Sequence, residues 1–398
     1  MAPRLRERIA VLRGLAALPR QLGRRPRPAD APLRVRFAYA EMGAPTRYRV
    51  HHHVEQALAA GLSAEAVPLD DHKRCYDLSA CDLLYIHRLP LMSSSVPLLA
   101  AARLLRLPVV FDSDDLVWDE REREYSFLER RYDARTVARL VRAARRTRAV
   151  MRGADALVLS TPYLAARAAR DLGRPALVHP NALSRELVAL AALAYEERRA
   201  KPADERPVIG YFCGTPLVHD EDLASIGEGL CAALESHPQA RLRIYGELRL
   251  GGPLAAPAYA GRIEQRPAVD WRELPRHITM VDINIAPLVD NPQRRGKSAV
   301  KYLEAAAVGV PTVAARMEPY QDDIAHGETG LLAADAAEWA ACLGRLLASP
   351  AERHRMGEAA RAAVLARSTT DALAGRFAAL LARVARGAGA APARNAGP

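Results

Sequence analysis

The stretch KSAVKYLEAAAVGVPTVAA, residues 297–315, decides the fold prediction. It predicts a helix with one acidic residue, Glu304, followed by a turn at Gly309 and a short buried strand. Lys297, Lys301 and Glu304 lie three or four residues apart and therefore share one helical face near its start. A helix start with added lysines suits a phosphate, and a carboxylate further in suits sugar hydroxyls, as in a nucleotide-sugar site. A solvated charged face is the alternative.

The alternation of short apolar runs and helices extends in both directions from this stretch. Such runs occur at 33–40, 81–89, 107–119, 206–215, 240–248 and 281–288. Short strands that alternate with helices predict βαβ units and parallel sheets. We therefore expect an α/β protein with two doubly wound, Rossmann-like domains that face each other across a cleft.

The composition predicts where these domains begin and end. A helix followed by a charged, proline-containing connector indicates a domain boundary near 190. The expected parts are a basic leader at 1–32, an N-terminal domain at 33–190, a linker at 191–206, a C-terminal domain at 207–368, a last helix at 369–386 that packs back on the N-terminal domain, and a disordered tail at 387–398.

Charge and cysteine usage limit the class of protein. The chain has 398 residues, a net charge of +11 and five cysteines. The cysteines show no zinc-ligand spacing and their number is odd, so a reducing, cytoplasmic environment is expected. No apolar run approaches the roughly 20 residues that span a bilayer. Arg13 interrupts the apolar part of the N-terminus, which argues against a signal peptide.

The leader at 1–32 is rich in arginine, and its leucines recur at three or four residues. This spacing is typical of an amphipathic helix. Such a segment either lies on an anionic membrane surface or forms a poorly ordered basic extension. Both interpretations stay open from the sequence.

Polar residues that follow the strands of the C-terminal domain are candidates for a ligand site, because ligands bind beyond the carboxyl ends of parallel strands. Gly214 and Thr215 form a small-residue turn that can bring N–H groups to a phosphate, with His219 close behind. Simple turn chemistry is the alternative. Arg294, Arg295 and Lys297 can neutralise a pyrophosphate, or they form a solvated basic loop.

Taken together, residues 208–333 resemble the donor-binding domain of the retaining glycosyltransferases of group 1, or family 4, which have the GT-B fold. The matching pieces are IGYFCGTPLVHDEDL, VDINIAPL, KSAVKYLEAAAVGVPTVAA and EPYQDDIAHGETGLLA, in the family's order. The N-terminal domain is similar only in architecture and in pieces such as RYRV, FDSDDLVWD and VHPNAL. The resemblance implies sugar transfer from a nucleotide-sugar donor to a glycan or lipid-linked acceptor with retained configuration, as in cell-surface polysaccharide biosynthesis.

The resemblance also implies roles for individual donor-side residues. Glu304 matches the second glutamate of the family's paired-glutamate motif, which contacts the ribose hydroxyls. The first glutamate would fall at Gly296, so this chain departs from the family there. Relatives often carry an arginine and a lysine after the glycine that corresponds to Gly214, whereas this chain has Thr215 and the His219–Asp220 region there. Arg295, Lys297 or Lys301 is expected to supply that positive charge, and Lys297 to stabilise the leaving diphosphate. The expected donor-binding residues are Gly214, Thr215, His219, Arg295, Lys297, Ser298, Lys301 and Glu304.

Asp114 and Asp115 are the candidate catalytic residues of the N-terminal domain. An aspartate cluster can ligate magnesium or manganese. GT-B relatives generally work without a catalytic metal, so the resemblance implies no metal and no cofactor. We expect these carboxylates near the reacting sugar or the acceptor hydroxyl. Helix capping and an ion pair with nearby arginines are the alternatives.

Arg47, Arg49 and His87 are the acceptor-side candidates, since they lie at a helix start or follow a strand of the N-terminal domain. The basic leader favours a lipid-linked acceptor and a peripheral contact with an anionic membrane at the inner face of the cell. A GT-B nucleotide-sugar epimerase and a basic nucleic-acid-binding protein are the alternative functions. No nucleic-acid-binding module is recognisable, and aromatic residues for base stacking are few.

Overall fold

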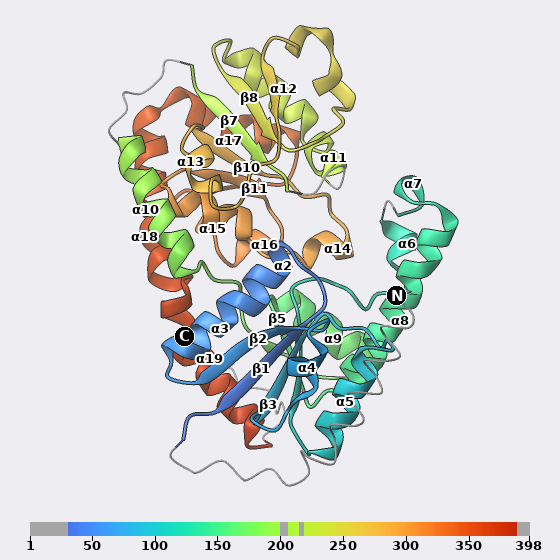
Figure 1. Ribbon diagram of the computed structural model, residues 1–398. Coiled ribbons are helices and arrows are strands. Elements are labelled where there is room, and N and C mark those ends of the chain that lie inside the picture. Colours follow the sequence, from blue (N-terminus) through green and yellow to red (C-terminus); the bar gives the residue numbers. More distant parts are fainter. Residues whose placement is uncertain (1–30, 127, 200–205, 215–218, 388–398) are drawn as a thin grey trace. The chain divides into compact units, whose positions relative to one another are not determined.

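The computed structural model describes residues 31–126, 128–199, 206–214 and 219–387 (Figure 1). The chain divides into two compact units: the first contains the residues up to Ala182 and those from Thr370 onward, and the second contains Leu183–Thr369. The predictions for the leader up to residue 30, for Thr215 and for the tail from 388 lie outside the described residues.

The first unit is built on a parallel six-stranded sheet with the order β2-β1-β3-β4-β5-β6. The central strands β3, β4 and β5 are buried along their whole length, as expected for a parallel sheet with helices on both faces. The strands are β1 (Arg34–Tyr39), β2 (Ser63–Pro68), β3 (Leu83–His87), β4 (Val109–Ser113), β5 (Ala156–Leu159) and β6 (Leu177–Val178).

Helices cover the two faces of this sheet. On one face, α3 and the last helix, α19, pack side by side and enclose Phe37, Tyr85 and Phe377. The other face buries Trp118 and Leu164. The helical segments are α2 (Ala44–Thr46), the π-helical turn η1 (Arg47–His51), α3 (His52–Ala59), α4 (His72–Tyr76), α5 (Ser95–Leu104), α6 (Glu122–Tyr125), α7 (Leu128–Arg131), α8 (Ala134–Gly153), α9 (Pro162–Leu172) and α19 (Thr370–Ala385).

The second unit repeats this architecture with the strand order β12-β11-β10-β7-β8-β9, again parallel throughout. Its strands are β7 (Val208–Phe212), β8 (Arg241–Tyr245), β9 (Ile263–Arg266), β10 (Ile283–Ala286), β11 (Thr312–Ala315) and β12 (Leu331–Ala333). The expectation of two doubly wound α/β units is therefore confirmed.

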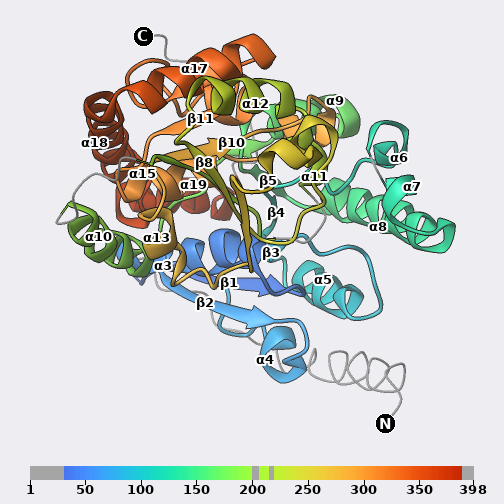
Figure 2. The same ribbon diagram turned by 90° about the horizontal axis from the view of Figure 1, so that it is seen from above.

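Figure 2 shows α12 and α17 of the second unit next to each other, in agreement with their extensive packing. The helical segments of this unit are α10 (Arg185–Arg199), α11 (Asp220–Ala224), α12 (Gly227–Ser236), the 3-10 turns η2 (Gly252–Ala255) and η3 (Pro257–Tyr259), α13 (Leu274–Ile278), α14 (Pro292–Arg295), α15 (Val300–Ala307), α16 (Glu318–Gln321), α17 (Ala336–Ala348) and α18 (Pro350–Arg367).

The boundary between the units differs from the expected one near 190. It lies between Ala182 and Leu183, because α10 packs against α13 and α15 and so belongs to the second unit. Residues 200–205 of the charged connector seen in the sequence lie outside the described residues. The long helix expected over 121–151 is also divided, into the short helices α6 and α7 and the long helix α8.

The turn at Gly309 joins α15 to β11 and requires a glycine. Its φ is +68°, a left-handed conformation that other residues rarely adopt. A Cβ built there would also lie 3.0 Å from the Tyr195 ring. At Gly357 of α18, a Cβ would lie only 2.0 Å from the Gly309 carbonyl oxygen. Two glycines therefore let α18 cross directly over the turn that the sequence predicted.

Candidate functional site

The carboxyl edge of the second sheet is the first candidate site. Its strand order changes direction at β7, whose neighbours are β8 and β10, and ligands of open parallel sheets bind at such a point. The helix α11 follows β7, and α14 and α15 follow β10. The predicted donor-binding residues come from these segments. The fold therefore brings them to one edge of one sheet.

Asp222 organises this edge. It is fully buried, and its carboxylate lies 2.8 Å from His219 Nδ1 and accepts hydrogen bonds from Arg294 Nε and the Val289 N–H, each at 3.0 Å. Burial alone would raise the pKa of Asp222, but the His219 hydrogen bond and the Arg294 charge outweigh it, so the pKa is lowered. The ionised carboxylate can only accept hydrogen bonds.

His219 is neutral near pH 7, because burial lowers its pKa to about 4 despite the hydrogen bond to Asp222. The proton of the neutral ring therefore lies on Nδ1, which donates to Asp222, and the lone pair lies on Nε2. This predicted donor-side residue is thus oriented by Asp222. No role was predicted for Asp222, and Arg294, expected as one of three cations for a pyrophosphate, pairs with Asp222.

Lys301 lies on α15 at the carboxyl end of β7. Its Nζ donates to the Phe212 carbonyl oxygen at 2.5 Å and stands 5.5 Å from the centroid of the Tyr211 ring. Burial lowers the pKa of Lys301. Within the described residues, no carboxylate lies within ion-pair distance of this ammonium group. A cation held only by neutral groups is well placed to receive an anionic ligand.

Arg295 is held in a different way. Its Nε and Nη2 donate to the two oxygens of Asp290 at 2.6 and 2.7 Å, and its Nη1 donates to Glu318 at 2.6 Å. Two carboxylates therefore already compensate the guanidinium. Arg295 is therefore less able than Lys301 of α15 to bind an anionic ligand.

The other predicted donor-side residues occupy the same edge. Lys297, Ser298 and Glu304 are partly buried, and Gly214 is exposed. Gly296, at the position of the missing glutamate, is buried. Gly246, which follows β8, has a φ of +122°, and a Cβ there would lie 2.2 Å from the Cys213 carbonyl oxygen. The strand ends therefore approach each other closely beside the Gly214 turn. That turn continues into residues outside the described part of the chain.

Asp112 organises the carboxyl edge of the first sheet. It is fully buried and accepts from Arg49 Nε at 3.0 Å, from Arg49 Nη2 at 2.5 Å and from the Tyr85 hydroxyl at 2.6 Å, while His87 Nδ1 lies 3.0 Å away. Burial alone would raise the pKa of Asp112, but the Arg49 charge and the hydrogen bonds from His87 and Arg49 lower it to about 2. Asp112 was not among the predicted site residues.

The position of Arg49 corrects its expected place on an acceptor surface. The side chain is fully buried, because it pairs with Asp112 on one side and donates to the His179 carbonyl oxygen and Asn181 Oδ1 on the other, at 2.7 and 3.1 Å. Arg47, two residues earlier in η1, is partly buried, and its guanidinium lies 5.3 Å from the Tyr48 ring centroid. His87 is buried at the end of β3.

Asp114 and Asp115 both face Arg88. Arg88 Nη2 lies 2.7 Å from Asp114 Oδ1 and 3.4 Å from Asp115 Oδ2. Burial alone would raise the pKa of Asp114, but the Arg88 charge lowers it. Arg88 has a φ of 50°, which is uncommon for a residue other than glycine and is often found at functional sites. The ion pair with a nearby arginine, one alternative from the sequence, is therefore present.

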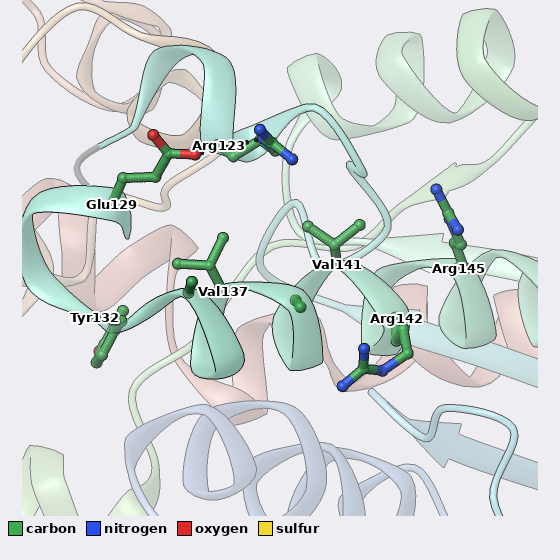
Figure 3. Close-up of a pocket in the computed structure, with 9 residues that line it drawn as sticks. Arg123, Glu129, Tyr132, Val137, Val141, Arg142 and Arg145 are labelled. Atoms are coloured by element: carbon green, nitrogen blue, oxygen red, sulfur yellow. Dashed lines mark ion pairs between the residues drawn. The ribbon is translucent and has the colours of Figure 1, made fainter.

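A groove of about 580 Å³ lies between α6, α7 and α8 of the first unit. Figure 3 shows Val137 and Val141 of α8 projecting towards Arg123 and Glu129, which are paired at 3.5 Å. Arginines contribute to its wall, and α8 carries no acidic residue. The groove thus combines an aliphatic floor with a positively charged border.

Two further searches covered only the described residues. No group of three or more His, Cys, Asp or Glu side chains there could hold a metal ion. None of the helices in this part of the chain is long and apolar enough to cross a membrane.

Comparison with known proteins gives the following matches. Residues 227–379 match the family described as glycosyl transferase-like. Among curated proteins, none matches the chain by sequence.

Solved structures match most of the chain. HepE of Anabaena, in complex with UDP and glucose, has 14% identity, a TM-score of 0.61, and coverage of 88% of this chain and 99% of that chain. Sucrose-phosphate synthase of Thermosynechococcus elongatus has 17% identity, a TM-score of 0.62 and the same coverage. A glycosyltransferase of Rickettsia africae has 10% identity, a TM-score of 0.59, and coverage of 88% and 98%. At these identities the likeness shows the fold.

Proposed function

We propose that this chain, which has the GT-B fold and a glycosyl transferase-like second unit, is a retaining glycosyltransferase that uses a nucleotide-sugar donor. Its acceptor is a glycan or a lipid-linked glycan, as in cell-surface polysaccharide biosynthesis. The bound UDP-glucose in the structure of Anabaena HepE supports a nucleotide-sugar donor for a protein of this fold. The resemblance seen in the sequence supports the retention of configuration.

The observation that carries this proposal is the unpaired ammonium of Lys301 at the carboxyl edge of the second sheet. Among the cations whose contacts are described, Arg294 and Arg295 are compensated by carboxylates, whereas Lys301 is held by a carbonyl oxygen and an aromatic ring. A diphosphate is the ligand that such a cation favours. The neutral His219, oriented by Asp222, adds a polar contact beside it.

This arrangement supports the following division of roles. Lys301 and Lys297, with the N–H groups of the Gly214 turn, stabilise the charge that develops on the leaving diphosphate. Glu304 orients the ribose. Asp114 and Asp115, paired with Arg88, lie at the edge of the first sheet and contact the reacting sugar or the acceptor. The acceptor attacks from the face that the diphosphate leaves, and the diphosphate takes its proton.

A donor screen tests the proposal. A bound ligand raises the melting temperature by mass action, so we expect one of UDP-, GDP-, dTDP- and ADP-sugars to shift the unfolding of the full chain. The same donor with an acceptor should give a product whose anomeric proton shows retained configuration by NMR, also in excess chelator. If no nucleotide sugar stabilises the protein, the proposal fails. Donor turnover without any acceptor would instead indicate an epimerase.

The groove on α8 supports an acceptor that is anchored in an anionic membrane, at the inner face of the cell. Its aliphatic floor fits a lipid chain, and its arginine border fits lipid phosphates. Proteins that bind single-stranded nucleic acid stack bases on aromatic side chains, and Tyr132 is the one aromatic residue among the described residues that line this groove.

Vesicle sedimentation tests the membrane contact. Arg142→Glu in the groove should reduce binding to vesicles that contain phosphatidylglycerol, and phosphatidylcholine vesicles should bind neither form. Arg241→Glu, on an exposed position of β8 in the second unit, makes the same charge change and should bind like the wild type. Equal losses for the two variants would show diffuse attraction and refute a role for the groove. Deleting residues 1–28 measures the share of the leader.

A further inference from the structure

Several buried polar atoms at the carboxyl edge of the first sheet have no hydrogen-bond partner. They are His87 Nε2, Arg88 Nε and Ser160 Oγ. His87 and Arg88 end β3 and Ser160 follows β5, and these strands flank β4 in the sheet. Buried polar groups in native proteins are almost always paired, so three orphaned atoms along neighbouring strand ends point to a polar ligand that pairs them.

Two other unpaired polar atoms of this unit lie away from this edge. His53 Nε2 and His179 Nδ1 are also without partners, but both rings pack on Phe377 of α19, with centroids 4.5 and 4.6 Å away. They belong to the core layer between the sheet and α19. His87, in contrast, is the last residue of its strand, opposite Asp112. Among these three histidines, His87 is therefore the one whose orphaned atom lies at the edge where ligands of parallel sheets bind.

The contacts of His87 fix which ring nitrogen carries the proton. Asp112 is ionised, because Arg49 pairs with it through two nitrogens, and its oxygens can only accept. His87 Nδ1, 3.0 Å from Asp112 Oδ1, must therefore donate. In the neutral ring the lone pair then lies on Nε2. When the ring is neutral, the free nitrogen is an acceptor, and its partner is then a donor such as a hydroxyl group.

We infer that His87 Nε2 accepts a hydrogen bond from a sugar hydroxyl and thereby binds and orients the acceptor. This inference rests on the proposed function and assigns one specific hydrogen bond to the acceptor site. Tyr85 and Arg49 act behind it, because they hold Asp112 in place and Asp112 holds the ring. Arg88, with its unpaired Nε, and Ser160, with its unpaired hydroxyl, offer further contacts for a polyhydroxylated ligand.

Two substitutions separate ligand binding from structural support. In His87→Asn, the side-chain amide can still donate to Asp112, but nothing replaces Nε2. In His87→Gln, the longer amide reaches the position of Nε2 with its oxygen but gives up the bond to Asp112. A binding role therefore predicts that Asn is the more harmful substitution for acceptor binding. A purely structural role predicts the opposite order.

The probes are octyl glycosides of glucose, galactose, mannose and N-acetylglucosamine, whose binding to the full chain is followed by saturation-transfer NMR. We expect at least one glycoside to bind the wild type, a more than tenfold weaker signal response in His87→Asn, and partial recovery in His87→Gln. His51→Asn, an exposed histidine of the same unit, serves as the matched control and should bind normally.

The inference is overturned if the wild type binds none of these glycosides or if His87→Asn binds them as well as the wild type. The donor-induced thermal shift is measured on the same samples and should persist in His87→Asn. If the wild type shows no donor-induced thermal shift but still binds a glycoside, the proposed donor is refuted and the inference about His87 remains supported. The two failures are thus distinguishable.

Discussion

The carboxyl edges of the two sheets share one arrangement of side chains, but the surroundings of that arrangement differ. Each edge has a buried aspartate, Asp112 or Asp222, that contacts an arginine and the Nδ1 atom of a histidine. Asp112 is enclosed by side chains alone, whereas Asp222 also accepts from a loop N–H and has the uncompensated Lys301 nearby. From this difference we expect side-chain contacts to hold the first edge in one arrangement. We expect the second edge to bind an anionic ligand.

The largest expected effect is the loss of stability in Asp112→Asn. The change leaves the Arg49 guanidinium, itself fully buried, without its counter-charge. Breaking a buried ion pair in this way costs about 3–5 kcal/mol of unfolding free energy. Denaturant unfolding followed by hydrogen exchange of peptides from each unit would measure the loss and locate it in the first unit.

Asp222→Asn is the matched control for this comparison. An asparagine oxygen can keep the bond from the Val289 N–H, so we expect a smaller loss, about 2 kcal/mol, confined to the second unit. If both variants lose the same unfolding free energy, the two edges do not differ in rigidity, and the difference inferred here between them is wrong.

The next effect concerns donor binding and separates Lys301 from Arg295. Lys301→Met keeps the length of the side chain and removes the ammonium group. A hydrogen bond to a charged group is worth about 2 kcal/mol, so donor affinity should fall roughly 30-fold. Isothermal titration with the donor found in the thermal screen would measure this change.

Arg295→Met is the control, since Asp290 and Glu318 already compensate that guanidinium. We expect it to change donor affinity several-fold less than Lys301→Met does. A larger effect of Arg295→Met would show that the loop rearranges on donor binding. It would also move the phosphate contact away from Lys301.

The position of Lys301 and Glu304 could be predicted from the sequence because local rules fix it. A βα turn with glycine, a 3.6-residue period and the ligand-binding edge of parallel sheets suffice to place both residues. The alternation of apolar runs predicted both sheets for the same reason. Each of these signals depends on neighbours within one helix or strand.

The aspartates Asp112 and Asp222 were missed because their roles depend on distant partners. Arg49 lies 63 residues before Asp112, and Arg294 lies 72 residues after Asp222. No local pattern distinguishes a buried, paired arginine from an exposed one, so Arg49 was expected at an acceptor surface. One signal was available: Asp112 lies within the apolar run of the strand, whereas Asp114 and Asp115 follow the end of the strand, so Asp112 could be expected to be buried in the sheet.

Acidification should weaken the fold through one buried histidine in each unit. Burial lowers the pKa of His219 to about 4 and that of His179 to about 3. An unfolded histidine titrates near 6.5, so between pH 6.5 and these lower values the unfolded chain binds protons that the folded chain does not. Stability is therefore present above pH 6.5 and falls as the pH drops, by up to about 1.4 kcal/mol per pH unit for each group.

Replacing one histidine tests this slope. His219→Gln should flatten the pH dependence of the second unit between pH 6.5 and 4, measured as unfolding free energy against pH. His326→Gln replaces an exposed histidine of the same unit and serves as the comparison. Its slope should stay steeper than that of His219→Gln. An unchanged slope in His219→Gln would mean that its proton equilibrium does not differ between the folded and unfolded states.

The smallest effect concerns how each edge bends its backbone. The second edge uses Gly246 at a φ of +122°, whereas the first places Arg88 at a φ of 50°. Arg88→Gly and Arg88→Ala both remove the ion pair with Asp114, so their difference isolates the backbone. A left-handed conformation costs a non-glycine residue about 1–2 kcal/mol, so the glycine variant should be the more stable by about 1 kcal/mol.

At an ordinary helical position the order of these two substitutions reverses. Glycine is less favourable than alanine in a helix by about 1 kcal/mol, so Arg139→Gly on α8 should be less stable than Arg139→Ala. If Arg88 followed this ordinary order, its backbone would carry no strain in the folded protein. If the reversed order is found, Arg88 keeps a strained backbone beside His87 and Asp114 in the folded protein. The buried contacts of the first edge then offset this strain, whereas the second edge avoids it with a glycine.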